Sequence, residues 1–287
     1  MKINPYDENA FSMDHPRGTV LFNYLLMGDR GKPFENYRYI LGRQEADFRM
    51  PRHRHTFEQI RLSVVGDMNI GEQGFLHEGE IGYFPEGQTY GPQDDPFEPG
   101  EEKRLQLVLQ FGGASGVGMS AGRGRGPGNA EAQRERRERH EVKFPRPRYQ
   151  GVVKMNPTYF NWLPVPGAPG VERKFFGSFS ERAFWIDMVK IEAGAEWTST
   201  SADARRLTVA LSGSGTVEGT KINRLGAVEA DPGEDAHYAA DEELVLYTIG
   251  LPPIQLPTVP SDQFDISMTD GAIQFENARD ARDATSV

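Results

Sequence analysis

Residues 104–111 constrain the fold most, because polar and apolar side chains alternate along them: Arg-Leu-Gln-Leu-Val-Leu-Gln-Phe. Successive side chains of a β-strand point to opposite faces, so the leucines would face one way and Arg104, Gln106 and Gln110 the other. The chain also has 32 glycines and 20 prolines, which separate short apolar runs. Short runs bounded by turn residues favour strands over helices. We therefore predict an all-β, antiparallel fold.

Other segments predict strands of the same kind. Residues 19–27 are apolar enough for a buried strand, and residues 34–41 alternate loosely. Residues 60–65 alternate again, and Gly66 and Asp67 predict a hairpin turn into residues 68–70.

Two histidines, His53 and His55, come shortly before the strand at 60–65. On an extended segment, residues two apart project from one face, so both imidazoles would lie side by side. A carboxylate and an amide follow at Glu58 and Gln59. Converging nitrogen and oxygen donors of this kind bind divalent metals, so we expect a metal site here.

The phase of this strand leaves two interpretations open. Gln59, Arg61 and Ser63 share the parity of the histidines, whereas Ile60 and Leu62 take the other parity. In a half-buried antiparallel sheet, the polar face meets water. In a barrel, the polar face lines a ligand pocket. A second sheet, a second domain or a partner subunit then covers the aliphatic outside of the barrel. A partner subunit in that place would make the protein a homodimer through its barrel faces. The strand at 104–111 repeats the pattern, so we favour the pocket.

A second motif follows at residues 79–90, where Gly79, Pro85 and Gly87 punctuate a strand and a tight turn before Tyr90. Together the two motifs resemble those of the cupin superfamily, which read H-x-H followed shortly by E or Q, and G-x5-P-x-G-x2-H. Tyr90 occupies the place of the final histidine. The resemblance covers residues 19–111 and, more weakly, 151–251. It implies two tandem antiparallel jelly-roll barrels, a bicupin.

The resemblance also implies a metal held by His53, His55 and Gln59, with Glu58 as the alternative third ligand. Such a site suits Fe(II), because two histidines and one further donor leave coordination positions open for a substrate and dioxygen. Similar cupins bind manganese, nickel, copper or zinc. Tyr90 would be an axial ligand or a proton donor, and its phenol, with a pKa of about 10, must lose its proton to ligate well.

Arg61 is the best candidate for holding a substrate carboxylate, because its planar fork pairs two oxygens at once. The alternative for Arg61 is a surface salt bridge. Further polar side chains could line a pocket, and their alternative is ordinary exposure to water. These further candidates are Gln88, Gln93, Arg104 and Gln106.

The composition changes after residue 111. The glycine-rich run at 112–128 lacks the Gly-Lys-Ser/Thr of a phosphate-binding loop, and residues 129–141 predict a short exposed helix with Asn129 as its N-cap. Glutamates interleave the arginines of residues 123–148, which favours a solvated linker over a nucleic-acid-binding arm. The formal charge of −10 also disfavours a nucleic-acid partner.

The second half repeats the organisation of the first. Aligning Gly213 with Gly66 puts Thr200, Ala202 and Arg206 where the three ligands stand, and these do not form a ligand set. His237 takes the position of Tyr90. A lone histidine is more often structural or exposed than a ligand, so we place no site there.

Composition excludes several classes of protein. The chain has no cysteine, which excludes disulfides, thiolate catalysis and Cys-ligated metals. The first residues lack the apolar core of a signal peptide, and no run approaches the length of a membrane span. We expect a soluble, cytoplasmic protein whose partner is a small molecule.

These observations predict a lead-in (1–18), a barrel with the active site (19–111), a linker with a short helix (112–150), a degenerate barrel (151–260) and a tail (261–287). The expected function is a non-heme iron dioxygenase-like oxidoreductase acting on a small carboxylate-bearing or phenolic compound. One alternative is a redox-neutral lyase, decarboxylase or cyclase that uses the metal as a Lewis acid. The other is a metal-free protein that binds a small ligand.

Overall fold

A computed structural model describes residues 1–12, 19–29, 36–98, 100–115, 119, 141–253, 264–268 and 273–275. Within these residues the regular structure consists of β-strands and one 3-10 turn, η1 (Pro157–Tyr159), which confirms the all-β prediction. The helix expected at 129–141 lies outside the described residues except for Glu141, which begins a strand. In the described part of the chain, no helix is long and apolar enough to cross a membrane.

The chain forms two compact units. The first barrel comprises Phe11–Met155 and Leu256–Val287, and the second barrel comprises Met1–Ala10 and Asn156–Gln255. The structure thus assigns both ends of the chain to other units than the sequence boundaries implied. The start of the chain contributes a strand to the second barrel, and the segment after the second barrel returns to the first.

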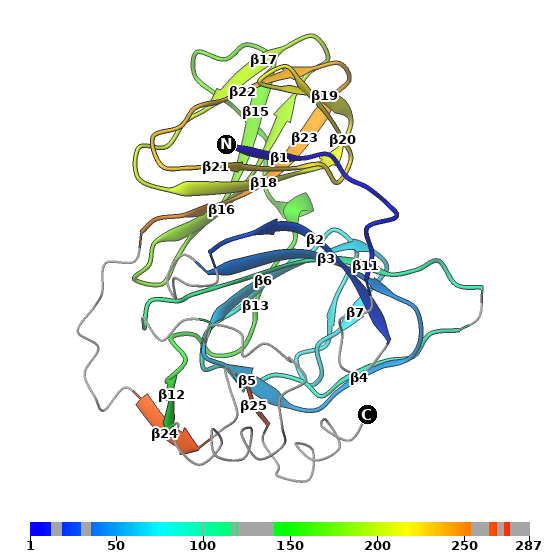
Figure 1. Cartoon of the computed structure of the whole chain (residues 1–287), viewed down its shortest axis with the longest axis vertical. Helices are drawn as coiled ribbons and strands as arrows, with labels where there is room; N and C mark the ends of the chain where they lie inside the picture. The colour runs from blue at the N-terminus through cyan, green and yellow to red at the C-terminus, as the bar shows by residue number, and fades with distance from the viewer. Residues whose placement is uncertain are drawn as a thin grey trace. The chain divides into compact units, whose positions relative to one another are not determined.

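One six-stranded antiparallel sheet forms the main wall of the first barrel (Figure 1). The segments expected as strands at 19–27, 60–65 and 104–111 are β2, β6 and β11 of this sheet. Its order is β13 (Val153–Met155), β9 (Ile81–Phe84), β6 (Glu58–Val65), β11 (Leu105–Phe111), β3 (Tyr37–Gln44) and β2 (Val20–Met27).

The register of this sheet decides which side chains face the inside of the first barrel. Gln59 lies opposite Phe84 on β9 and Gln110 on β11, and Gln110 lies opposite Arg38 on β3. Paired residues share a face, so these side chains form one line across the sheet. Ile60 points to the other face, and both it and Gln59 are 1% exposed. The polar face at Gln59 therefore does not meet bulk water.

Short pairs of strands complete the first barrel: β4 (Phe48–Met50) with β10 (Gln93–Asp95), β5 (His53–His55) with β25 (Ile273–Phe275), β7 (Met68–Asn69) with β8 (Phe75–Leu76), and β12 (Glu141–Pro145) with β24 (Phe264–Met268). Because β7 pairs with β8 and not with β6, the predicted hairpin at Gly66 is wrong. The backbone N–H of Gly66 donates to Glu78 at 2.8 Å, and Asp67 accepts the backbone N–H of Glu78 at 3.0 Å. These bonds hold the chain against the turn at residue 78.

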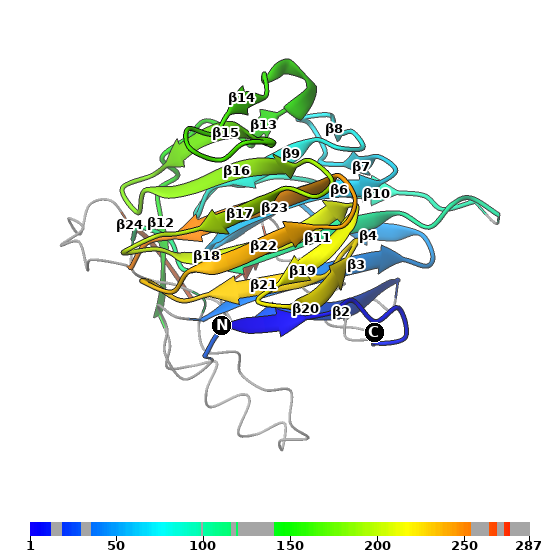
Figure 2. The ribbon, with the colours of Figure 1, turned by 90° about the horizontal axis from the view of Figure 1, so that it is seen from above.

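The second barrel contains two sheets that face each other (Figure 2). Its apolar cluster takes Val189 and Leu246 from one sheet and Val217 and Tyr238 from the other. The seven-stranded sheet has the order β1 (Lys2–Asn4), β21 (Ala227–Ala230), β18 (Arg205–Ser212), β23 (Leu244–Leu251), β16 (Phe184–Ile191), β15 (Val171–Phe179) and β14 (Leu163–Pro164). The four-stranded sheet has the order β17 (Glu196–Ser199), β22 (Ala236–Ala240), β19 (Ser214–Val217) and β20 (Thr220–Asn223).

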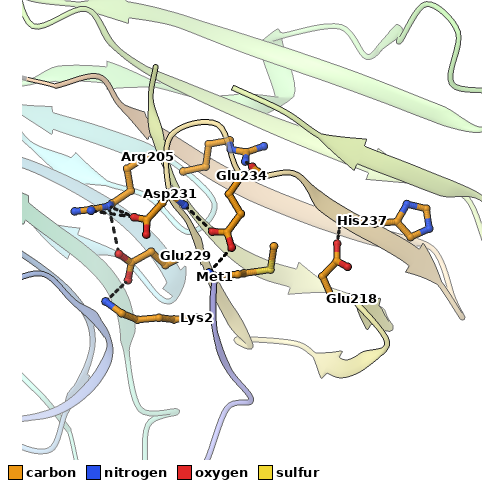
Figure 3. A network of polar contacts seen from close by, with 9 residues as sticks. Met1, Lys2, Arg205, Glu218, Glu229, Asp231, Glu234 and His237 are labelled. Atoms are coloured by element: carbon orange, nitrogen blue, oxygen red, sulfur yellow. Dashed lines mark hydrogen bonds and ion pairs between the residues drawn. The ribbon is translucent and has the colours of Figure 1, made fainter. Parts of the chain in front are cut away.

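Strand β1 lies within the segment expected to be a polar lead-in. Lys2 lies opposite Glu229 on β21, and its Nζ is 2.9 Å from Oε2 of Glu229 (Figure 3). Backbone pairing and this ion pair fix β1 at the edge of the seven-stranded sheet. Neither contact leaves a periodic apolar pattern in the sequence, so pattern analysis could not find the strand.

Candidate functional site

His53 and His55 are held between two extended segments. One edge of β5 pairs with β25, and His53 also pairs with Tyr90 through backbone bonds of 3.0 Å in each direction. The imidazoles are buried, and their centroids are 4.9 Å apart with the ring planes at 82°. The carbonyl oxygen of Pro51 lies 2.6 Å from Nδ1 of His53. That contact places the proton on Nδ1, so Nε2 is the basic nitrogen of this ring.

The hydroxyl of Tyr90 is the centre of the polar cluster. It lies 3.0 Å from Nε2 of His55, 3.1 Å from the side-chain amide of Gln59 and 3.2 Å from the guanidinium of Arg61. Burial raises the pKa of the Tyr90 phenol, although the positive charge of Arg61 opposes that shift. The phenol therefore keeps its proton at neutral pH.

Gln59 links the imidazole side of the cluster to Arg61. With its amide oxygen turned toward Arg61, it accepts from Nε at 2.8 Å and from a terminal nitrogen at 2.9 Å, and it also accepts the Tyr90 hydroxyl at 3.1 Å. The amide of Gln110, on the neighbouring strand, lies 3.0 Å from the Gln59 amide. Gln59 thus reaches the histidine side of the cluster through the Tyr90 hydroxyl, which also contacts His55.

Arg61 points into the barrel and not into a surface salt bridge. Its guanidinium donates to Oε1 of Gln93 at 3.3 Å and lies 4.7 Å above the ring of Phe84. No carboxylate among the described residues forms an ion pair with Arg61. Asp95 attracts its charge electrostatically, but only at longer range. A half-buried guanidinium beside neutral partners is suited to binding an anion.

Glu58, the alternative third ligand, lies on the opposite face of β6. Its Oε2 accepts the backbone N–H of Glu86 at 2.9 Å. The Glu86 carboxylate in turn accepts from the Ser115 hydroxyl at 2.6 Å and from Arg148 at 2.7 Å. Burial and the neighbouring charge of Glu86 raise the pKa of Glu58 to about 8. Adjacent residues of a strand point to opposite faces, which is why Glu58 and Gln59 have different surroundings.

The remaining substrate-binding candidates are not all at the cluster. Gln88 accepts the backbone N–H of Gly151 at 3.2 Å and donates to the Thr89 carbonyl at 2.7 Å, so it holds a loop. Arg104 bonds to Gln44 at 3.3 Å, just before the start of β11. Gln106 lies opposite Ser63, on the face that carries Gln59 and Arg61. Of these candidates, Gln106 is the one that shares the face of the cluster.

The sequence analysis missed Arg38 as a candidate. It lies opposite Gln110, on the line of side chains that includes Gln59, and it is half-buried. Its Nε is buried without a hydrogen-bond partner among the described residues. Only the pairing of β3 with β11 reveals this position, because the loose alternation of residues 34–41 does not say which strand lies beside them.

His237 lies on the surface of the second barrel, as expected for a lone histidine. Its Nδ1 is 3.1 Å from the Thr198 hydroxyl, its side chain is 47% exposed, and its backbone N–H donates to Glu218 at 2.8 Å (Figure 3). The next residue, Tyr238, points inward and is buried. The alignment by spacing is therefore one residue away from the tyrosine that faces the interior.

Two contacts of the Tyr90 hydroxyl are as long as the separation between two ligands of one metal. Ligands about 2.1 Å from a metal and at right angles to each other lie about 3.0 Å apart. The Tyr90 hydroxyl is 3.0 Å from His55 Nε2 and 3.1 Å from the Gln59 amide. Among the described residues, no three His, Cys, Asp or Glu side chains gather to hold a metal. A metal here would thus need Gln59, with or without Tyr90, beside the two imidazoles.

No protein-family model and no curated protein matches this sequence. Solved structures do match. A protein from Nostoc punctiforme described as a candidate dioxygenase has a TM-score of 0.57 at 9% identity, over 93% of this chain and 81% of that one. Quercetin 2,3-dioxygenase from Acinetobacter baumannii has a TM-score of 0.51 at 11% identity, over 89% and 87%. Vicilin from hazelnut, Corylus avellana, has a TM-score of 0.51 at 14% identity, over 86% and 84%.

The chain has the jelly-roll fold of the cupins. At these identities the likeness shows the fold alone. Dioxygenases and a vicilin share the cupin fold with this chain, so the fold does not choose a reaction. The function has to be argued from the side chains around Tyr90.

Proposed function

We propose that the first barrel is a metal-dependent oxidoreductase site of the cupin dioxygenase type, acting on a small carboxylate-bearing or phenolic compound. The observation that supports it is the gathering of two buried imidazoles, whose ring centroids are 4.9 Å apart, around a Tyr90 hydroxyl that lies 3.0 Å from His55 and 3.1 Å from the Gln59 amide. His53, His55 and Gln59 would hold the metal, with Fe(II) as the expected ion.

When bound, an iron ion of this kind supplies a centre that takes up dioxygen beside the substrate. The side chains around it have separate tasks. Arg61 binds the carboxylate or phenolate of the substrate with its planar fork, and Phe84 beneath the guanidinium keeps that fork in place. Tyr90 is protonated and within hydrogen-bond distance of Arg61, so it can donate its proton to an oxygen of the bound substrate.

A second candidate function is the binding of a small organic anion without a metal. The charge of the cluster favours it: Arg61 is positive, and the carboxylate nearest in sequence, Glu58, turns away to Glu86. A dication beside a guanidinium and three neutral donors receives less electrostatic stabilisation than one with a carboxylate ligand. In this case Arg61 and Tyr90 bind the anion directly, and no turnover follows.

Oxygen uptake tests the proposal. Protein loaded anaerobically with Fe(II) would be mixed with quercetin and with a set of small phenols and aromatic carboxylates, and dissolved oxygen followed with an electrode. We expect uptake with at least one compound, a large loss in Arg61→Gln, and full activity in His237→Ala. Saturable binding of these compounds without oxygen uptake would instead support the metal-free alternative.

A further inference from the structure

Arg206 is a buried guanidinium inside the second barrel. It is 1% exposed and lies on β18, opposite Ala230, on the face that carries the apolar cluster of this barrel. One terminal nitrogen donates to the Ser199 hydroxyl at 2.8 Å, and the other donates to the backbone carbonyl of Glu234. Arg206 thereby bridges the two sheets of the barrel.

No carboxylate among the described residues forms an ion pair with Arg206. The Glu234 side chain turns away and accepts the backbone N–H of Asp231 at 3.0 Å (Figure 3). Within the described residues, Nε of Arg206 has no hydrogen-bond partner. A buried charge bound only by neutral groups is costly, so this guanidinium is suited to receive an anion.

A line of polar side chains continues from Arg206 along the same face. Thr208 lies opposite Thr248 with their hydroxyls 3.0 Å apart, and Thr248 lies opposite Asp187 on β16. Asp187 is 3% exposed, and one of its oxygens has no partner among the described residues. Its other oxygen is 2.5 Å from Nε of Arg173, whose side chain is 42% exposed. The line therefore reaches solvent at the Arg173 end.

Trp185 supplies a flat apolar surface beside this line. Gly250 lies opposite both Arg206 and Trp185, and a Cβ atom on Gly250 would lie 2.0 Å from the indole. The glycine therefore lets the indole lie across β23 toward Arg206. Two strand spacings, about 10 Å, separate β18 from β16.

We propose that the second barrel binds a small planar carboxylic acid that also carries a hydroxyl or amino group. Arg206 takes the carboxylate, the indole of Trp185 packs against the ring, and the free oxygen of Asp187 accepts from the hydroxyl or amine. This site is independent of the metal proposal, because every residue in it belongs to the second barrel.

Intrinsic tryptophan fluorescence of the full chain tests the proposal with 4-hydroxybenzoate as the probe. The three tryptophans, Trp162, Trp185 and Trp197, are all in the second barrel, so their emission reports on that barrel. We expect a saturable change in emission with 4-hydroxybenzoate and at least about tenfold weaker binding of the uncharged 4-hydroxybenzamide.

Two variants of neighbouring arginines sharpen the test. Arg206→Gln should weaken binding of 4-hydroxybenzoate at least about tenfold, and Arg206→Lys should restore part of it. Arg205→Gln is the matched control, because Arg205 points to the other face and pairs with Asp231 at 2.9 Å. The proposal is overturned if the native protein binds the acid and the amide equally, or if 4-hydroxybenzoate causes no saturable change in its emission. Both measurements use the native protein, so they hold whether or not Arg206→Gln folds.

Discussion

The hydroxyl of Tyr90 lies 3.0 Å from Nε2 of His55, although the two residues are 35 positions apart in the sequence. This contact puts a phenol where the second cupin motif has a histidine. Because the same hydroxyl also contacts Gln59 and Arg61, one oxygen atom links the proposed ligands to the proposed substrate-binding group.

Replacing Tyr90 with phenylalanine tests whether the Tyr90 hydroxyl acts as a proton donor or as a metal ligand. We expect Tyr90→Phe to fold, to keep its metal and to lose turnover, at a cost in stability of about 1–3 kcal/mol from the hydrogen-bonding groups left without the hydroxyl. Metal content, oxygen uptake and urea denaturation measure the three effects. Loss of metal in this variant would instead make the phenol a ligand.

Glu58 should make the stability of the protein depend on pH. The carboxyl has an ordinary pKa of 4.5, and burial beside Glu86 raises it to about 8 in the folded protein. The folded state then holds a proton that the unfolded chain releases above pH 4.5, so the free energy of unfolding falls as pH rises from 4.5 toward 8.

Glu58→Gln should remove this dependence, because an amide keeps the acceptor for the Glu86 N–H and carries no charge. Urea denaturation at several pH values measures it. We expect the variant to gain stability relative to the native protein as pH rises from 4.5 toward 8. Glu98→Gln, at an exposed carboxylate, is the control, and parallel curves for Glu58→Gln and the native protein would refute the assignment.

Gly87 should be far less tolerant of substitution than Gly79 in the same motif. Both have positive φ, +76° and +82°, so an alanine at either costs about 1–2 kcal/mol of backbone strain. A Cβ atom on Gly87 would also lie 1.8 Å from the Pro145 carbonyl oxygen, whereas nothing lies within 4 Å of one on Gly79. We expect Gly87→Ala to lower the free energy of unfolding by several kcal/mol. Guanidinium denaturation of Gly87→Ala and Gly79→Ala measures the difference.

The sequence predicts the parts of the structure that depend on local alternation. The alternation of residues 104–111 and 60–65 identified the central strands, and the spacing of His53 and His55 predicted two imidazoles on one face. Parity already grouped Gln59 with the histidines, but the cupin resemblance allowed Glu58 as well, so the sequence left two candidates for the third ligand. Only the fold shows which side chain turns inward.

Long-range pairing is the part that the sequence does not reveal. Strand β1 is a polar three-residue segment at the start of the chain, and it pairs with a strand more than two hundred residues away. Tyr238 was missed for a related reason: counting residues after Pro232 leads to His237, but only the pairing of β22 shows which of the two neighbours faces inward. Side-chain direction in a short strand depends on its partner strand.

Metal content is the most direct test of the account. Native protein, His53→Ala and His237→Ala would be loaded anaerobically with Fe(II), freed of unbound ion and analysed for iron. We predict about one iron per chain in the native protein and in His237→Ala, and none in His53→Ala. Native protein that retains no iron, or a loss of iron in His237→Ala with His53→Ala unaffected, would contradict a metal site at the paired imidazoles.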